Sequence, residues 1–139
     1  MTPTTFVRRR TPSVAYLWIA IGAVLGACAR FAVTHYSSIK TAHHGFPYGT
    51  LFVNVTGSML AGFVLAYAAG RVPLDSRWRL LLVTGFCGAY TTFSAFAFET
   101  VAYAQEGRWG FFALNFILNN GLCLAAVVAG TRVAAAASA

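Results

Sequence analysis

The 139-residue sequence is poor in charge: Asp, Glu, Lys and Arg together make up 9% of it, and only three residues are acidic. Soluble domains average about 25% charged residues, so this composition indicates a protein that lies in lipid. The hydrophobic share of 58% and the mean hydropathy of +0.67 agree with that interpretation. Only short polar tails and connectors remain outside the apolar runs, and we expect no soluble domain that could perform chemistry.

Cysteine is also scarce. The three cysteines, Cys28, Cys87 and Cys123, are odd in number and far apart, which argues against a disulfide framework and against a spaced metal motif. We expect them to be small packing residues. Three histidines gather in the first polar connector with no further ligand near them in sequence, and we interpret them as ordinary loop residues: His35, His43 and His44.

Four apolar windows are long enough to cross a bilayer, which takes about 20 residues. They cover residues 14–34, 49–69, 80–104 and 111–130. The sequence therefore predicts an all-α membrane protein with a single four-helix domain over residues 1–139. The basic N-terminus and its apolar run also resemble a signal peptide. That run continues past Arg30 to a full span and three more spans follow, so we expect it to be retained.

The ten basic residues are distributed unevenly. With four spans, the N-tail, the second connector and the C-tail share one side, which carries seven of them: Arg8, Arg9, Arg10, Arg71, Arg77, Arg79 and Arg132. The other side carries Lys40 and Arg108, and the tenth, Arg30, lies within the first span near its far end. The positive-inside rule then predicts a multi-pass protein of the cell inner membrane with both termini in the cytoplasm. Because these residues flank spans, the net charge of +7 is a poor argument for nucleic-acid binding.

Polar side chains inside the spans are costly in hydrocarbon and usually face protein or water. Three spans carry polar or aromatic residues at helical spacing, so each set shares one helix face: Asn54 and Ser58; Asn115, Asn119 and Cys123; Phe93, Phe96 and Glu99. Helix packing alone explains Ser58, Thr56 and Asn120, but not the asparagines 54 and 119 or the third-span set. Since no catalytic base lies beside a nucleophile, these faces indicate a pathway rather than an active site.

The third span contains "TGFCGAYTT", which places Gly85 and Gly88 before a threonine pair in mid-membrane. Such residues permit a broken helix, whose freed carbonyls must be satisfied by protein, water or an ion. A ring of carbonyls suits a bare monovalent cation; a plain kink is the alternative. The edges of the Phe93 and Phe96 rings carry partial positive charge and can attract a small anion without binding it too tightly for release.

Three blocks of this sequence, "GAVLGACARF" (22–31), "GTLFVNVTGSMLAG" (49–62) and "GFCGAYTTFSAF" (85–96), closely resemble the signature blocks of the CrcB/Fluc fluoride channels. The resemblance extends over all four spans. It implies an antiparallel, dual-topology dimer with two narrow pores that passively export fluoride. The pore would be lined by Phe93, Phe96 and the amide of Asn54, with Ser94 beside it and Glu99 nearer its mouth.

The resemblance also implies a structural sodium ion at the dimer centre, held by the backbone carbonyls of Gly88 and Thr91. Gly22 and Gly26 form a GxxxG pair for close packing, and Arg30 matches the arginine that ends the first block. The chain departs from the family at two points. Ala89 stands where a second glycine is common, and Asn115 and Asn119 occupy the places of a tyrosine and a serine in the polar track of the fourth span.

Two questions remain open at this stage. The dimer can be a homodimer, or a heterodimer with a homologue of opposite charge bias, because seven basic residues against two favour one orientation. The function can also differ. A proton-coupled small multidrug-resistance-type transporter needs a carboxylate deep in the membrane, yet the first span has none and Glu99 is the only acid within a span. A non-transporting assembly subunit would leave the polar faces unexplained.

Overall fold

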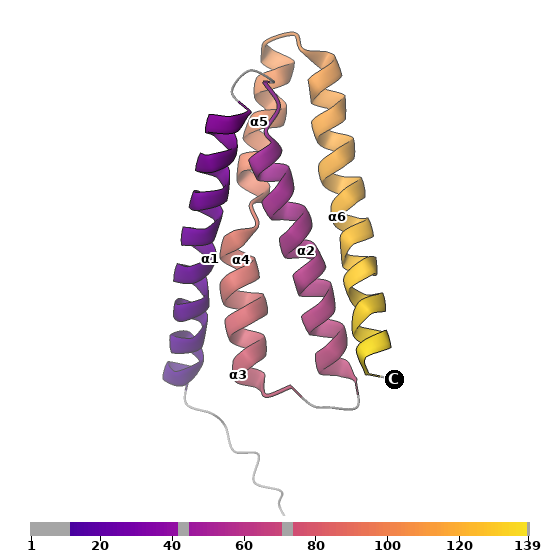
Figure 1. Cartoon of the computed structure of the whole chain (residues 1–139). Coiled ribbons are helices and arrows are strands. Elements are labelled where there is room, and N and C mark those ends of the chain that lie inside the picture. Colours follow the sequence, from indigo (N-terminus) through magenta and orange to yellow (C-terminus); the bar gives the residue numbers. More distant parts are fainter. Residues whose placement is uncertain (1–11, 42–44, 71–73, 139) are drawn as a thin grey trace, which may run out of the picture.

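The computed structural model describes residues 12–41, 45–70 and 74–138. Four helical stretches within these ranges are long and apolar enough to cross a membrane: Ser13–Lys40, Tyr48–Ala69, Ser76–Gln105 and Trp109–Ala137. They stand side by side as one upright bundle (Figure 1). The all-helical fold with four candidate spans is therefore confirmed.

Three of the spans are single helices and the third is composite. The single helices are α1 (Pro12–Lys40), α2 (Tyr48–Ala69) and α6 (Trp109–Ala137). The third span consists of α3 (Ser76–Arg79), the π-helix η1 (Leu80–Cys87), α4 (Gly88–Tyr90) and α5 (Phe93–Gln105). The π-helical stretch was not anticipated, because its wider turns leave no periodic signal in an almost uniformly apolar segment.

The helices extend beyond the apolar windows of the sequence. Helix α1 runs to Lys40 instead of ending at 34, and so takes up part of the predicted polar connector. Hydroxyl groups there donate to carbonyls of the preceding turn, as Thr34 does to Arg30 at 2.9 Å and Ser38 to His35 at 2.7 Å. Because these bonds stay within the helix, polar residues do not terminate it.

Helix α1 packs against the first half of the third span through its GxxxG pair. A Cβ on Gly22 would collide with the carbonyl oxygen of Leu81, and one on Gly26 with that of Phe86. Glycine therefore lets the two backbones approach closely. Between helices in lipid this close van der Waals packing matters, because the hydrophobic effect does not drive their association.

The third span is interrupted in its middle, where the ribbon between α4 and α5 loses its coil (Figure 1). Thr91 and Thr92 adopt extended conformations, with ψ of 156° and 106°. Helix α5 then restarts with Thr92 as its N-cap, whose Oγ1 accepts a hydrogen bond from the Ala95 N–H at 3.2 Å. The predicted interruption of the third span is confirmed at these two residues.

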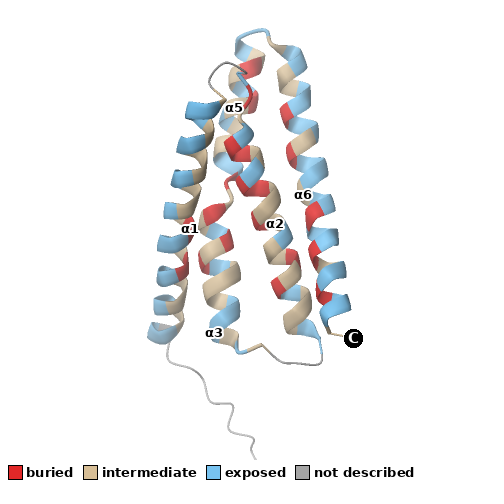
Figure 2. Cartoon of the chain, in the orientation of Figure 1, coloured by how far each residue is buried: buried red, intermediate tan, exposed pale blue. Residues whose placement is uncertain are grey.

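Burial is concentrated where α2 meets the break and α6, while much of the outer surface of the bundle is exposed (Figure 2). Exposed Leu, Val and Phe side chains on the outer faces are expected of helices that face lipid. The buried polar residues are Thr50, Asn54, Thr92, Thr100, Asn115 and Asn119. Asn115 and Val53 are the largest side chains that are fully buried. The interior of this bundle is therefore partly polar, and that polar interior holds the candidate site.

Candidate functional site: a polar core at the helix break

Asn54 of α2 satisfies the backbone that the break leaves open. Its Oδ1 accepts from the Thr92 N–H at 2.7 Å, and its Nδ2 donates to the Thr92 carbonyl at 3.2 Å. A single amide thus replaces the helical acceptor of the Thr92 N–H and gives the Thr92 carbonyl an additional donor, at a buried site. In a continuous helix the Thr92 N–H would donate to the carbonyl of Gly88. Because the Thr92 N–H donates to Asn54 instead, the Gly88 carbonyl does not receive this hydrogen bond.

A row of side-chain hydrogen bonds continues from Asn54 across α6 to α5. Asn54 Nδ2 donates to Asn119 Oδ1 at 3.0 Å, and Asn119 Nδ2 donates to Asn115 Oδ1 at 2.8 Å. Asn115 Nδ2 then donates to Thr100 Oγ1 at 2.9 Å, and Thr100 donates to the Phe96 carbonyl at 2.6 Å. We call these four side chains (Asn54, Asn119, Asn115 and Thr100) the amide row. The structure therefore brings together the three asparagines that the sequence placed on two separate helix faces.

Two phenylalanines of α5 lie edge to face beside this row. The ring centroids of Phe93 and Phe96 are 5.4 Å apart at an interplanar angle of 61°. Phe96 is buried, whereas Phe93 is 76% exposed and points away from the protomer interior. Ser94 is exposed as well, with its hydroxyl oxygen 3.2 Å from that of Thr92. The aromatic pair therefore joins the interior to an outward-facing surface.

A cavity of about 250 Å³ lies at this junction. Its walls include the amides of Asn54 and Asn119, both rings of the aromatic pair, the hydroxyl of Ser58 and the thiol of Cys123. We call it the break cavity. Among the described residues that line it, none carries a charge. Such a site offers N–H donors and ring edges to a small polar species without fixing it by a full charge.

Glu99 lies in a different place from the amide row. Its Oε1 accepts a hydrogen bond from the Thr50 hydroxyl at 2.5 Å, while its buried Oε2 has no partner among the described residues. It lines a second cavity of about 410 Å³, which we call the Glu99 cavity. The other walls include Tyr103 of α5, residues 45–50, and hydroxyl side chains of α1 such as Ser37. The residues of the predicted polar face of the third span therefore belong to two cavities: Phe93 and Phe96 line the break cavity, and Glu99 lines the Glu99 cavity.

Two functional candidates, Thr50 and Thr100, were missed by the sequence analysis. Thr50 is four residues before Asn54, so an i, i+4 signal was present on that face of α2. Thr100 is four residues after Phe96, which gives it the same spacing on α5. A threonine inside a span often bonds only to its own helix, and this ambiguity hides such residues from a sequence-based search.

The remaining candidates lie at the periphery of this core. Gly88 is exposed on the protomer surface, and Thr91 donates its N–H and hydroxyl to the Cys87 carbonyl at 3.0 and 2.9 Å. Arg30 is half-buried, and neither ion pair of the described residues involves it. His35 stacks on Phe31 with ring centroids 5.6 Å apart. The residues predicted at other positions, His43, His44, Arg8, Arg9, Arg10 and Arg71, lie outside the described residues.

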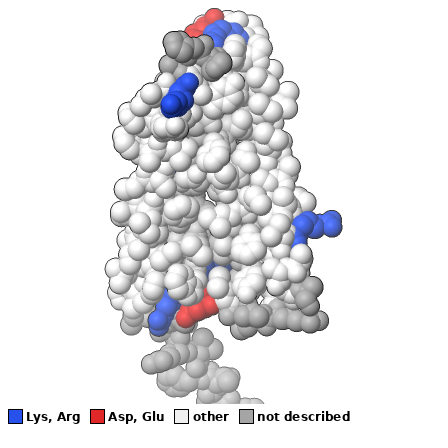
Figure 3. Space-filling model, in the orientation of Figure 1, with Lys and Arg blue, Asp and Glu red and all other residues white. Residues whose placement is uncertain are grey.

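Charge on the molecular surface is confined largely to the ends of the bundle. In Figure 3 most basic and acidic side chains of the visible face lie toward its two ends, and one basic side chain projects from a flank further from the end. Arg77 pairs with Asp75 at one end at 4.0 Å, and Arg108 pairs with Glu106 at the other at 3.2 Å. This distribution is the one that a bilayer requires of a spanning bundle.

Comparison with known proteins gives consistent matches over the same four spans. A sequence model described as CrcB-like protein, Camphor Resistance (CrcB), matches residues 17–131. A protein of Koribacter versatilis (strain Ellin345) is 50% identical over 113 residues, which cover 81% of this chain and 89% of that protein. One from Legionella pneumophila (strain Lens) is 45% identical over 119 residues, covering 86% and 88%. One from Roseiflexus sp. (strain RS-1) is 42% identical over 116 residues, covering 84% and 93%. All three are named fluoride-specific ion channel FluC.

Proposed function

Because the chain belongs to the CrcB family, we propose that it is a fluoride-selective channel that lowers cytoplasmic fluoride by passive export. The family consists of ion channels, so the chain is an ion channel and not an enzyme. With four apolar spans, it is a multi-pass membrane protein. The proton-coupled multidrug transporter is not favoured, since the relatives that match across these spans are named as fluoride channels.

The observation that carries this proposal is the composition of the break cavity. Two amides and two phenylalanine rings line it, and no described residue of the lining is charged. An anion that passes through must exchange its hydration shell for these groups and still leave, which calls for several weak sites rather than one strong site. Partial positive charge on N–H groups and ring edges meets that requirement.

The amide row offers a way for a small anion to enter without breaking the core. Both N–H groups of Asn54 are already engaged, one with the Thr92 carbonyl and one with Asn119 Oδ1. Fluoride at the break cavity would accept the second N–H in place of the Asn119 oxygen. The Asn54 N–H keeps an acceptor in this exchange, which avoids the desolvation cost of an orphaned donor, while the Asn119 oxygen gives up its hydrogen bond.

The same break supports a structural sodium ion. The carbonyls of Gly88 and Thr91 would hold it, and the transfer of the Thr92 N–H to Asn54 leaves the Gly88 oxygen available for a cation. Gly88 is exposed on the protomer, so a partner protomer could supply further ligands. Bound there, the ion would supply a fixed positive charge shared by two protomers.

The channel is proposed to be an antiparallel dimer, because Gly88, Phe93 and Ser94, which flank the break, are exposed in the single chain and available to a partner. The partner is either a second copy or a homologue of opposite charge bias. Accessibility of a C-terminal tag from each side of the membrane separates these cases. Mixed orientation of this chain alone, with full fluoride resistance, supports the homodimer. A single cytoplasmic orientation without resistance supports the heterodimer.

Reconstituted liposomes test the function directly. Vesicles loaded with fluoride and containing the purified chain should release it when a potassium ionophore balances the charge, as read by a fluoride electrode. Vesicles loaded with chloride and empty vesicles are the controls. Absence of fluoride release, or equal release of chloride, would contradict the proposal; for the heterodimer case the assay is repeated with the homologue present.

A further inference from the structure

The turn between α5 and α6 fixes the backbone of Arg108. The Arg108 N–H donates to the Tyr103 carbonyl at 2.8 Å, and the Gly107 N–H donates to the Ala104 carbonyl at 3.1 Å. Gly107 has φ of +70°, the left-handed conformation that favours glycine at this point of a helix end. This pair of bonds turns the chain back sharply, so the side chain of Arg108 returns over the end of α5.

The guanidinium of Arg108 is held between aromatic rings and a carboxylate. Its Cζ lies 4.9 Å from the ring centroid of Tyr103 and 4.3 Å from that of Phe111. Its Nη1 lies 3.2 Å from Glu106 Oε2. A planar guanidinium can stack on rings and donate in its own plane at the same time, which an ammonium group cannot do.

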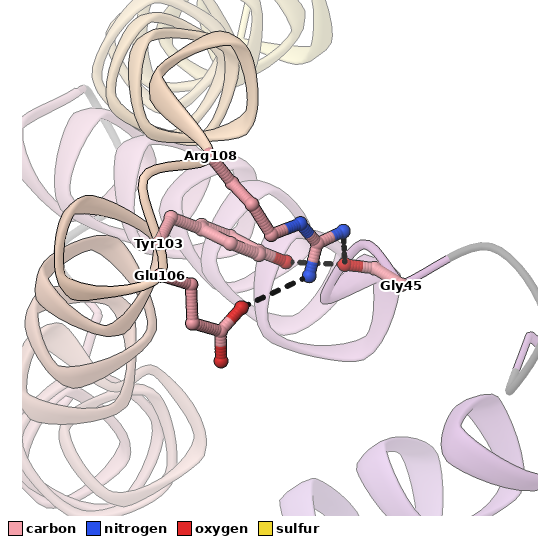
Figure 4. A network of polar contacts seen from close by, with 4 residues as sticks. All are labelled: Gly45, Tyr103, Glu106 and Arg108. Carbon is pink, nitrogen blue, oxygen red and sulfur yellow. Dashed lines mark hydrogen bonds and ion pairs between the residues drawn. The ribbon is translucent and has the colours of Figure 1, made fainter.

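The group that this arrangement holds is the carbonyl of Gly45 (Figure 4). The Tyr103 hydroxyl donates to it at 2.6 Å and Arg108 Nη2 at 3.4 Å. Gly45 has φ of +62°, which favours glycine, and a Cβ there would lie 2.8 Å from Arg108 Nη2, so that an added side chain would displace the guanidinium. The next residue, Phe46, is buried and packs near Phe111. We call Gly45, Tyr103, Glu106 and Arg108 the Gly45 latch.

The latch joins two walls of the Glu99 cavity. Gly45 begins the segment 45–50 that forms one wall, and Tyr103 belongs to the opposite wall on α5. Tyr103 is four residues after Glu99, so the two side chains lie on the same face of that helix. Thr50, at the other end of the segment, donates to Glu99 itself. The separation of the two walls is therefore fixed at one end by Thr50–Glu99 and at the other by the latch.

We propose that the Gly45 latch sets the width of the Glu99 cavity as the entry to the anion pathway, with Arg108 and Tyr103 as positioning residues. This inference rests on the proposed fluoride transport. The charge of Arg108 is already paired with Glu106 and stacked on two rings, so its contribution is geometric rather than a long-range attraction for anions. Glu99 Oε2 lies inside the cavity and has no partner among the described residues. Because a carboxylate repels an anion, the width of the cavity sets how closely a passing anion must approach this oxygen.

The test is fluoride efflux from liposomes containing the full chain, with its homologue where the active channel is a heterodimer. The variants are Arg108→Gln, Arg108→Lys, Tyr103→Phe and the double variant Tyr103→Phe/Arg108→Gln. Each single variant should lower the initial efflux rate several-fold. Lysine should not rescue, since it cannot stack on both rings and still reach the Gly45 carbonyl. The fold reduction of the efflux rate in the double variant should be smaller than the product of the fold reductions in the two single variants, because both groups act on one carbonyl oxygen.

Arg77→Gln is the matched control, because Arg77 also forms an exposed ion pair with an acid two residues away, at the opposite end of the bundle. It should retain the wild-type rate. Tyr103→Phe removes a single oxygen, so it still tests the latch if an arginine variant does not fold.

Three results would overturn the latch while leaving the channel intact: wild-type rates in all variants, full rescue by Arg108→Lys, or losses that multiply independently. Absence of efflux from the wild-type protein would instead contradict the proposed transport, and the latch's role in it would fall with it.

Discussion

The break cavity and the Glu99 cavity are built in opposite ways. The break cavity is assembled from regularly spaced residues within spans, its amides are held by one another, and no charge lines it among the described residues. The Glu99 cavity is assembled from helix ends and turns, contains a carboxylate, and depends on a contact between Gly45 and Arg108, 63 positions apart. Helix periodicity therefore specifies the break cavity, whereas the Glu99 cavity depends on tertiary contacts between connectors.

The largest expected effect on stability is at the break cavity. Asn54→Leu removes the acceptor of the Thr92 N–H and the donor to Asn119 Oδ1, and so leaves a buried N–H and a buried amide oxygen unsatisfied. Each such group costs about 1–3 kcal/mol, so we expect a loss on the order of 3 kcal/mol in the free energy of unfolding. Ser58→Ala, one turn further on the same face, is the control and should cost about 0.6 kcal/mol. Unfolding in mixed detergent micelles measures both; similar losses would show that Asn54 does not hold the break.

The second effect concerns the proposed sodium ion at the same break. If carbonyls of Gly88 and Thr91 hold it between protomers, sodium binds only the assembled state and stabilises the dimer by mass action. At a hundredfold excess over its dissociation constant the gain is about 2.7 kcal/mol. Dimer dissociation measured in sodium and in a large organic cation at equal ionic strength gives this difference. A dimer that is equally stable in both solutions would contradict the sodium site.

The break cavity is also the part of the molecule that the sequence describes best. The glycines and paired threonines of the third span predict an interrupted helix because they weaken helical bonding, and the interruption lies at Thr91 and Thr92. Asn115 and Asn119 share a face at i, i+4 spacing, and both belong to the amide row. The sequence did not show which helix supplies the next partner, because that depends on how α2 and α6 pack.

The Glu99 cavity, which we propose as the entry, could not be predicted in the same way. Glu99 appears on one polar face with Phe93 and Phe96, yet its hydrogen bond to Thr50 places it in a separate cavity. In the sequence, Arg108 is a basic residue of a short connector and indicates only the orientation of the spans. Its stacking on Tyr103 arises only when the turn reverses the chain. Contacts of this kind depend on residues distant in sequence, for which a single sequence carries no periodic signal.

A smaller effect is expected at the Glu99 cavity. Gly45→Ala places a side chain in the left-handed region, at a cost of about 1–2 kcal/mol, and displaces the Arg108 guanidinium. We expect lower stability and lower fluoride efflux together. Gly110→Ala is the matched control, because Gly110 lies in the first turn of α6 with nothing within 4 Å of its added Cβ. It should gain up to about 1 kcal/mol, since alanine is the better helix former. Lower fluoride efflux in Gly45→Ala than in Gly110→Ala supports the latch, and equal efflux in the two variants contradicts it.

The smallest effect on stability, with a clear effect on transport, is expected from the aromatic pair. Phe96→Ile keeps an apolar side chain in a buried site and should cost less than about 1.5 kcal/mol, and Phe93→Ile should cost less because that ring is 76% exposed in the protomer. Both should reduce fluoride efflux several-fold, because an aliphatic chain lacks the positive ring edge. Phe98→Ile is the control, since Phe98 is also 76% exposed on α5 but lines neither cavity. Wild-type efflux in both Phe93→Ile and Phe96→Ile would remove the rings from the pathway, and equal losses in all three variants would show a general requirement for aromatic residues on this helix instead.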